Sequence, residues 1–434
     1  MNLLYNRPLF IDEANVARNL FDRGYGDLFR PLDHAQYAPP LYLVLAKLLG
    51  ELFGYTELPL RLPAFLGGLL AAGGLYLAGR RLHLGYFTAL PLLLLFVNPT
   101  VLRYVTELKP YGLDLGIATL LLAGALHTPP RLHGRLLWYW ILAGSLAPWI
   151  SLPAVFILAA VGLRGLYHDR RWAFPIVGWL LSFGILYVLV LAPSVGSGYL
   201  NSFHQDYFLP WPDSLEDLRR WGGIGFILLR LGFGLTAVAL AWGLLLLVAA
   251  WIPRPRHAWL LLPLLIVLGV SSFGYYSLIE RLMLFVLPGI WLFVAVGARR
   301  LWRSSPKLGR VFLLLATVVA LDGSHSLRHF YSPVRFSDGR RLADVARGTT
   351  YRVHPLAAPV VDYYLRIHPG GGTGGTEKPY GGLAAGEENW LYDVLTAPRP
   401  NYDLKQDSAR AAERGCQVNA EALYRAKVLR IKCP

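Results

Sequence analysis

The stretch from Leu60 to Arg81 reads LRLPAFLGGLLAAGGLYLAGRR, an apolar run that ends in two arginines. It has the roughly 20 residues that an α-helix needs to cross the hydrocarbon core of a bilayer. The first predicted span is 60–80, and similar apolar runs follow it at 86–104, 111–126, 136–150, 151–166, 173–193, 223–251, 258–273, 281–299 and 311–321. The sequence therefore predicts an α-helical polytopic membrane protein with about ten transmembrane helices.

The composition excludes other classes of protein. Of the 434 residues, 55% are hydrophobic and only 16% are charged, so too little polar surface is present for a water-soluble protein. The formal net charge of +15 suggests nucleic acid, but the basic residues lie in short loops between apolar runs. That pattern is typical of membrane topology, and no nucleic-acid partner is predicted.

The distribution of Lys and Arg predicts the orientation. Alternate loops on one side hold most of them, namely Arg80, Arg81, Arg131, Arg135, Arg164, Arg170, Arg171, Arg254, Arg256, Arg299, Arg300, Arg303, Lys307 and Arg310, against Lys109, Arg219 and Arg220 on the other. The arginine-rich side is predicted to be cytoplasmic. The outer side then carries the acidic loop residues Glu107, Asp206, Asp213, Glu216, Asp217 and Glu280, together with both ends of the chain.

Three segments need separate interpretation. The apolar segment Pro39–Phe53 is short, and a crossing there would invert every later loop, so it is predicted to lie at the outer interface. The run 136–166 is too long for one span and contains Pro148 and Pro153, which predicts two short helices. The interval 194–222 is predicted to be an outer loop whose aromatic residues anchor at the interface.

The tail has a soluble composition, which predicts a small C-terminal α/β domain outside the cytoplasm. The predicted division is 1–59 for an outer segment, 60–321 for the membrane domain and 322–434 for the soluble domain. Short β-rich runs are expected at Pro359–Leu365 and Lys427–Cys433, and the glycine-rich stretch 369–375 is expected to be a flexible loop. Cys416 and Cys433 form a disulfide if the compartment is oxidising, but sequence alone does not pair them.

Ionisable residues next to apolar runs are the candidates for a site. Charge at membrane depth is costly unless it serves a function. An adjacent Asp-Glu pair has a plain alternative as a helix cap. The candidates on the predicted outer face are Asp12, Glu13, His34, Arg61, Glu107, Lys109, Tyr111, Glu280 and Arg281. No metal motif is present, and His325, His329, His354 and His368 are interpreted as surface histidines.

Several of these residues lie in strings that resemble the GT-C membrane glycosyltransferases. The strings are Ile11-Asp12-Glu13-Ala14, Gln36-Tyr37-Ala38-Pro39-Pro40-Leu41, Leu52-Phe53-Gly54-Tyr55-Thr56-Glu57 with Leu60-Arg61-Leu62-Pro63, and Glu107-Leu108-Lys109-Pro110-Tyr111. The sequence looks like bacterial relatives of protein O-mannosyltransferases and lipid A aminoarabinose transferases, in the manner of glycosyltransferase family 39. The likeness covers residues 9 to about 125, with a looser match at Glu280-Arg281 before Pro288.

The resemblance implies inverting transfer of a hexosyl or pentosyl group from a polyprenyl-phosphate donor to an acceptor hydroxyl. It places the reaction at the outer face of the bacterial inner membrane, with a glycan, lipid or protein as acceptor. Asp12 is the expected general base and Glu13 its neighbour at the sugar. Lys109, Arg281, Arg61 and His34 would bind the lipid phosphate, with Glu107, Tyr111 and Glu280 as further polar groups. No cofactor is required, and the carboxylates leave room for a divalent metal.

Each of these assignments has an alternative. Arg61 can reach to lipid head groups, Lys109 can pair with Glu107, and Arg281 can pair with Glu280. Relatives carry a spanning helix before the Asp-Glu segment, so an upstream start, translocation of a short N-terminal tail, or a helix from a partner is expected. The rival functions are a lipid or glycan transporter or flippase, and an inactive assembly subunit. A transporter predicts ionisable groups or broken helices near the middle of the membrane.

Overall fold

The computed structural model describes residues 6–129, 131–194, 204–233, 243, 257–307, 309–311, 314, 336–367, 375–393 and 399–434. The chain forms two compact units, each built from segments that are distant in sequence. The first unit comprises Tyr25–Ala46 and Arg61–Ser332, and the second comprises Asn2–Gly24, Lys47–Leu60 and Pro333–Pro434. The predicted boundary near residue 322 lies outside the described residues.

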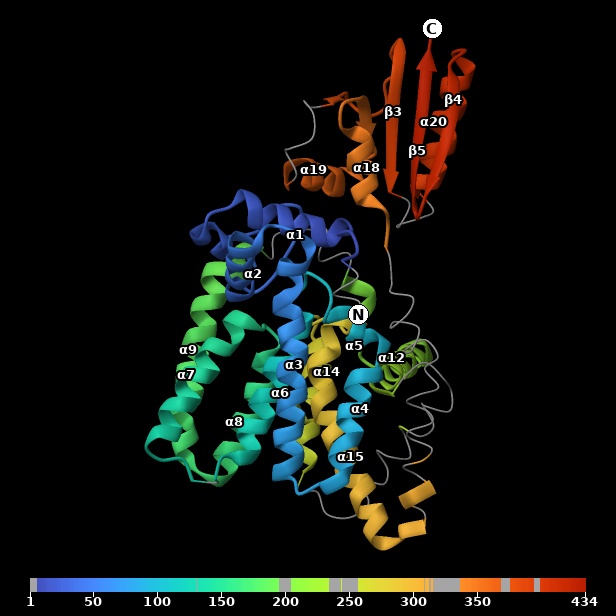
Figure 1. The fold of residues 1–434 in the computed structure, drawn as a ribbon. Helices are drawn as coiled ribbons and strands as arrows, with labels where there is room; N and C mark the ends of the chain where they lie inside the picture. The colour runs from blue at the N-terminus through green and yellow to red at the C-terminus, as the bar shows by residue number, and fades with distance from the viewer. Residues whose placement is uncertain are drawn as a thin grey trace. The chain divides into compact units, whose positions relative to one another are not determined.

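The first unit is helical (Figure 1). Helices α2 (Pro40–Phe53) and α3 (Glu57–Arg81) contribute to both units. The other elements are η1 (Tyr25–Phe29), η2 (Gly85–Thr88), α4 (Ala89–Val97), α5 (Pro99–Tyr104), α6 (Tyr111–His127), α7 (Arg135–Ile150), α8 (Ala154–His168), η3 (Arg170–Trp172), α9 (Ala173–Leu186), η4 (Tyr187–Leu191), α10 (Ala192–Ser194), η5 (Gln205–Tyr207), α12 (Leu215–Phe233), η6 (Ala258–Leu261), α14 (Leu262–Ser272), η7 (Glu280–Val286) and α15 (Leu287–Ser304).

Three helical segments in the described part of the chain are long and apolar enough to span a membrane: Glu57–Arg81, Arg170–Leu191 and Glu280–Ser304. Shorter apolar helices cover Gly85–Val97, Tyr111–His127, Ala154–His168 and Ala258–Ser272. The predicted helical character is therefore confirmed, while the total of about ten crossings stays a prediction. The predicted span 311–321 and the part of span 223–251 after Phe233 lie almost entirely outside the described ranges.

Helix α15 lies at the centre of the first unit. Nearly all of its apolar residues are buried, and the indole of Trp291 donates a hydrogen bond of 2.7 Å to the carbonyl of Gly232. Helices α3 and α6 approach each other through small residues, because a side chain added at Gly112 would meet the carbonyl of Ala64 and one at Gly67 would meet Gly112. Such contacts allow two helix backbones to touch, as between packed membrane helices. They place the first turn of α6 directly against α3.

Several predicted spans differ in detail from the observed helices. Span 86–104 is broken at Asn98, whose side-chain oxygen accepts hydrogen bonds from the amides of Thr100 and Val101 and so starts α5. The run 136–166 forms two helices, α7 and α8, as predicted. Helix α12 begins at Leu215, inside the interval predicted to be a loop. Segment Pro39–Phe53 is mostly helix α2, and its place at the interface stays a prediction.

The second unit combines α1 (Ile11–Asp22) with the C-terminal α/β fold, which confirms the predicted class of the tail. Its C-terminal elements are α18 (Gly339–Ala346), β1 (Thr350–Val353), α19 (Ala358–Ile367), β2 (Thr376–Glu377), β3 (Gly386–Asp393), α20 (Arg399–Glu413), β4 (Gln417–Leu423) and β5 (Ala426–Cys433). The sheet order is β2-β1-β3-β5-β4. Strand β1 runs parallel to β2 and β3, whereas β5 is antiparallel to β3 and β4.

The prediction of a strand at Pro359–Leu365 is wrong, because this stretch lies within helix α19. The β-branched pair Val360 and Val361 favours a strand locally. However, Pro359 is well suited to a first helical turn, and the buried residues Val360, Val361, Tyr363 and Tyr364 have helical spacing. Packing of that face overrides the local preference. The run Lys427–Cys433 is part of strand β5, as predicted.

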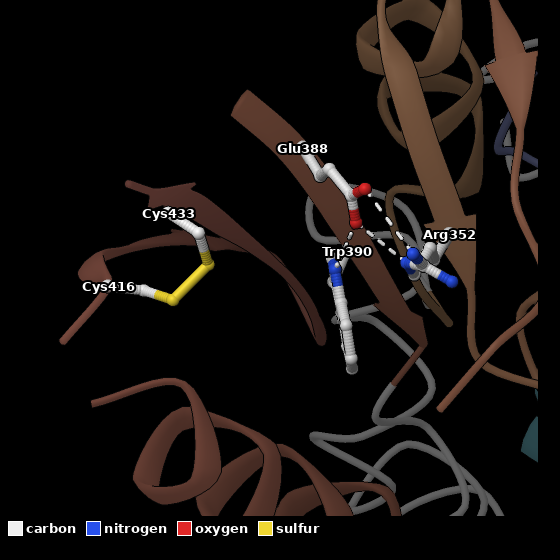
Figure 2. Close-up of a disulfide and its surroundings, with 5 residues drawn as sticks. All are labelled: Arg352, Glu388, Trp390, Cys416 and Cys433. Carbon is white, nitrogen blue, oxygen red and sulfur yellow. Dashed lines mark hydrogen bonds and ion pairs between the residues drawn. A yellow bond between two sulfur atoms is a disulfide. The ribbon is translucent and has the colours of Figure 1, made fainter. Parts of the chain in front are cut away.

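Cys416 and Cys433 form a disulfide, which Figure 2 shows beside a buried ion pair. The Glu388 carboxylate accepts hydrogen bonds from Arg352 Nε at 2.7 Å and from Lys378 Nζ at 2.5 Å. Burial opposes ionisation of Glu388, but the hydrogen bonds from these two cations lower its pKa below the usual 4.5. The disulfide and the ion pair of Glu388 therefore both stabilise this sheet.

Replacing both cysteines by serine is expected to lower the stability of the C-terminal fold by about 3 kcal/mol, because a loop of this size loses its restraint in the unfolded chain. The two cysteines are 17 residues apart in sequence. The measurement is urea-dependent proteolysis of the tail in the full-length protein. Reduced wild-type protein should match the variant, and an unchanged midpoint would contradict a stabilising role.

Candidate active site

The predicted site residues fall in both units, and each group is described by itself. Asp12 and Glu13 belong to the second unit. The first unit contains the others, His34, Arg61, Glu107, Lys109, Tyr111, Glu280 and Arg281.

A tight turn before α2 supplies a partner for Lys109. His34 and Ala35 both have left-handed backbone conformations, with φ of 63° and 52°. Such conformations are strained for residues other than glycine and persist where the surrounding structure fixes them. The turn leaves His34 exposed, and the next residue, Gln36, accepts a hydrogen bond of 2.7 Å from the Lys109 ammonium through its side-chain oxygen. Gln36 is part of a recognised string, but its role was not predicted.

The short helix α5 supplies partners for both predicted acidic residues. Arg103 Nε donates a hydrogen bond of 2.9 Å to the buried carboxylate of Glu107. The hydroxyl of Thr100 donates one of 2.9 Å to Glu280. Neither Arg103 nor Thr100 was predicted, although an arginine four residues before a glutamate at the end of an apolar run is a signal in the sequence. The contacts observed for Glu107 and Glu280 therefore involve α5.

Two tyrosines and a histidine lie within electrostatic range of Arg281. The rings of Tyr104 and Tyr111 are in edge contact, with centroids 5.2 Å apart, and the positive charge of Arg281 acts on both phenols. It also reaches His204, whose pKa is lowered below 6.5 by burial and then by Arg281. Both effects favour the neutral imidazole of His204. Its approach to Arg281 depends on tertiary folding, and the sequence contains no signal for it.

Arg61 is buried, with 1% of its surface exposed. A buried Arg61 side chain does not agree with the alternative in which Arg61 extends to the lipid head groups. Arg61 lies one turn before Ala64, on the face of α3 that meets Gly112 of α6. Arg61 is therefore close in sequence to the α3 residues that pack against the first turn of α6.

A second polar cluster lies deeper in the first unit and was not predicted. Asp114, one turn into α6, is buried, and Ser151, at the junction of α7 and α8, lies next to its carboxyl group. Burial, and then the negative charge of Asp114, raise the pKa values of Tyr37 and Tyr276. Tyr37 Oη, Asp114 Oδ1 and Ser151 Oγ make no hydrogen bond within the described residues. Buried polar atoms without a partner are costly and often mark a ligand site.

The two acidic residues of α1 have different surroundings. Glu13 is fully buried, and its carboxylate accepts a hydrogen bond of 3.4 Å from the amide of Phe10, which is the helix-capping role weighed above. Asp12 is partly exposed, and its carboxylate has no hydrogen bond or ion pair with the residues that the structure describes. Of the pair, Asp12 is the carboxylate available to a ligand.

Helix α1 is fixed to other segments of the second unit. Arg18 contacts Asp362 at 2.8 Å, and Arg366 contacts Asp22 at 2.8 Å. The hydroxyl of Tyr364 accepts a hydrogen bond from the amide of Leu9 and donates one to the buried Glu57, which also binds Arg340. These contacts come from both helix ends and from the segment before α1, so they hold the backbone of the Asp-Glu motif in a defined position.

No group of three or more His, Cys, Asp or Glu side chains in the described part of the chain is arranged to hold a metal ion. The groups near the start of α6 have the chemistry of anion recognition. Lys109 and Arg281 supply positive charge, Tyr104 and Tyr111 supply hydroxyl groups, and the start of α6 presents its amides. Together these groups suit a phosphate ester at the boundary of the membrane.

Apolar spanning helices with a C-terminal α/β fold define a class of multi-pass membrane protein, and two solved structures share this fold. One is ArnT from Cupriavidus metallidurans in the apo state, with 16% identity and a TM-score of 0.59 over 98% of this chain and 94% of that chain. The other is the same ArnT bound to undecaprenyl phosphate, with 15% identity and a TM-score of 0.55 over 99% and 95% of the two chains. No family model and no curated protein matches. The fold implied by the resemblance is confirmed.

Proposed function

We propose that this protein is a membrane glycosyltransferase that uses a polyprenyl-phosphate-linked sugar as donor. The observation that carries the proposal is that the charge of Arg281 acts on Tyr104 and Tyr111 at the start of α6, two residues after Lys109. This arrangement occurs in a chain whose fold matches an ArnT structure that holds undecaprenyl phosphate. A phosphate group on a lipid would satisfy both the charges and the position of these groups beside apolar helices.

In the proposed reaction, an acceptor hydroxyl oxygen forms a bond to the anomeric carbon while the bond from that carbon to the phosphate oxygen breaks. Asp12 accepts the hydroxyl proton, and the polyprenyl phosphate leaves with the bonding electron pair. Lys109 and Arg281, with Arg61 and His34, would stabilise the charge on the leaving phosphate. Glu107 and Glu280 would position α5 and η7, and the configuration of the sugar would invert. The proposed setting is the outer face of a bacterial inner membrane.

The test is transfer by purified protein in nanodiscs. Labelled undecaprenyl-phosphate sugars are supplied with candidate glycan, lipid and peptide acceptors. The expected result is release of undecaprenyl phosphate together with an equal amount of glycosylated acceptor. Donor that stays intact with every sugar and acceptor tested would contradict the proposal.

A lipid transporter is the second candidate, because a buried ionisable residue inside a spanning helix is typical of transport proteins. Asp114 is buried one turn into α6, which covers the predicted span 111–126. Proteoliposomes loaded with labelled donor distinguish the two functions. Movement of intact donor between leaflets without bond cleavage would favour transport, and cleavage coupled to transfer would favour the enzyme.

Asp114→Asn is expected to slow sugar transfer by about tenfold or more, because the carboxylate is a stronger acceptor for sugar hydroxyls than an amide. The thermal unfolding temperature should stay the same or rise, since the variant removes the cost of burying a charged carboxylate. Initial rates and melting curves in the same nanodiscs provide the measurement. A fall in both activity and melting temperature would instead indicate a structural role.

A further inference from the structure

A second cationic cavity lies in the first unit, at the opposite end of α6 from the candidate active site. It has a volume of about 900 Å³ and is lined by Arg81, Arg164, His168 and His257, with leucine side chains between them. The candidate active site is at Tyr111, and the cavity is at Leu126. With a rise of 1.5 Å per residue, the two are about 22 Å apart along the helix. The cavity is therefore a separate feature.

The two arginines are held in place by the end of α6. Arg81 Nε donates a hydrogen bond of 3.0 Å to the carbonyl of Leu126, and Arg164 donates one of 3.0 Å to the carbonyl of Ala125. These carbonyls belong to the last helical turn, which lacks partners within the helix and carries partial negative charge. The guanidinium of Arg164 also lies over the ring of Trp259, 4.5 Å from its centroid. Each guanidinium keeps further N–H donors that these contacts do not use.

The positive charge of this cavity is not balanced by protein carboxylates in the described part of the chain. Neither Arg81 nor Arg164 forms an ion pair there, and the two like charges are close enough to act on each other. Capping of α6 explains one hydrogen bond of each arginine. It does not explain why two cations and two histidines face one cavity. A bound anion would offset the repulsion.

We propose that this cavity binds the phosphoryl head group of an anionic phospholipid. Two fixed guanidinium groups suit the oxygens of a phosphodiester. The leucine lining suits the first methylene groups of the acyl chains, whereas a soluble anion would gain nothing from it. Trp259 and Tyr167 are aromatic residues of the kind that lie at the level of lipid head groups.

The experiment compares the full-length wild type with the double variant Arg81→Gln, Arg164→Gln. Glutamine keeps an N–H donor for the end of α6 but removes the charge. Arg80→Gln is the matched control, because Arg80 is the exposed neighbour of Arg81 and does not line the cavity. Native mass spectrometry measures the retention of phosphatidylglycerol and phosphatidylcholine by each protein. Melting curves in nanodiscs of the two lipids report folding.

The wild type and Arg80→Gln should retain phosphatidylglycerol in preference to phosphatidylcholine, and the double variant should bind phosphatidylglycerol about thirtyfold more weakly. All three should melt alike in phosphatidylcholine. Equal retention of both lipids by the wild type, or an unchanged preference in the double variant, would overturn the proposal. Pyrophosphate is tested alone on lipid-depleted protein, and arginine-dependent binding of it would overturn the assignment to a lipid.

Discussion

Replacing Asp12 by Asn is expected to lower the rate of sugar transfer by a factor of about 100 to 10,000, the range that general-base catalysis contributes. Asparagine keeps the size and position of the side chain but cannot accept the hydroxyl proton. Binding of undecaprenyl phosphate should be unchanged, because this variant alters no cation. Single-turnover transfer and lipid binding, measured on the same preparation, separate the two effects.

Asp22→Asn is the matched control for this prediction. Asp22 lies at the other end of α1 and forms an exposed ion pair with Arg366, which contributes little to stability. Its rate should stay within about twofold of wild type. Wild-type turnover by Asp12→Asn would exclude Asp12 as the base, whereas equal loss in both variants would point to a disturbed α1.

Replacing both Lys109 and Arg281 by Met is expected to weaken binding of undecaprenyl phosphate by a factor of about 100 or more, since charged hydrogen bonds contribute about 1.5–3 kcal/mol each. Methionine preserves length and apolar packing while it removes the charge. Equilibrium binding of the carrier lipid in nanodiscs is the measurement.

Arg220→Met controls for a general loss of positive charge. Arg220 is an exposed cation of α12 in the same unit, outside the cluster around Tyr111. Its affinity for the carrier lipid should match wild type. If the double variant Lys109→Met, Arg281→Met binds the carrier lipid as tightly as the Arg220→Met variant does, the phosphate-binding assignment is wrong.

Sequence reasoning succeeded where a signal is local. Apolar runs of the right length predicted the helices from α3 to α9, and two prolines predicted the division into α7 and α8. The family-like strings drew attention to Lys109 and Tyr111, and the looser match drew attention to Arg281; their roles stay predictions. The strand predicted at Pro359–Leu365 failed because β-branched residues favour a strand locally, while burial of one face in the folded domain favours a helix.

The partners of the site residues depend on tertiary structure to different degrees. Arg103 is a charged residue at the end of the predicted span 86–104, and Asp114 is one within the predicted span 111–126. Charges in such positions are a sequence signal of their importance. Gln36 binds Lys109 across 73 residues of sequence, and the charge of Arg281 acts on His204 across a comparable interval. Such pairs follow from packing alone. The assignment of α1 and the C-terminal fold to one unit likewise needs the folded chain.

The hydrogen bond between Lys109 and Gln36 bears on how the proposed donor and product would compete for this site. The uncharged side-chain amide of Gln36 is one acceptor for the Lys109 ammonium, and in the proposed reaction a phosphate would offer that ammonium an anionic acceptor. The gain in attraction is largest for the most negative ligand, and after transfer that ligand is the spent carrier, whose phosphate monoester carries more charge than the diester of the donor. In the proposed reaction the spent carrier would therefore bind more tightly than the donor, and accumulated carrier lipid is expected to compete with new donor.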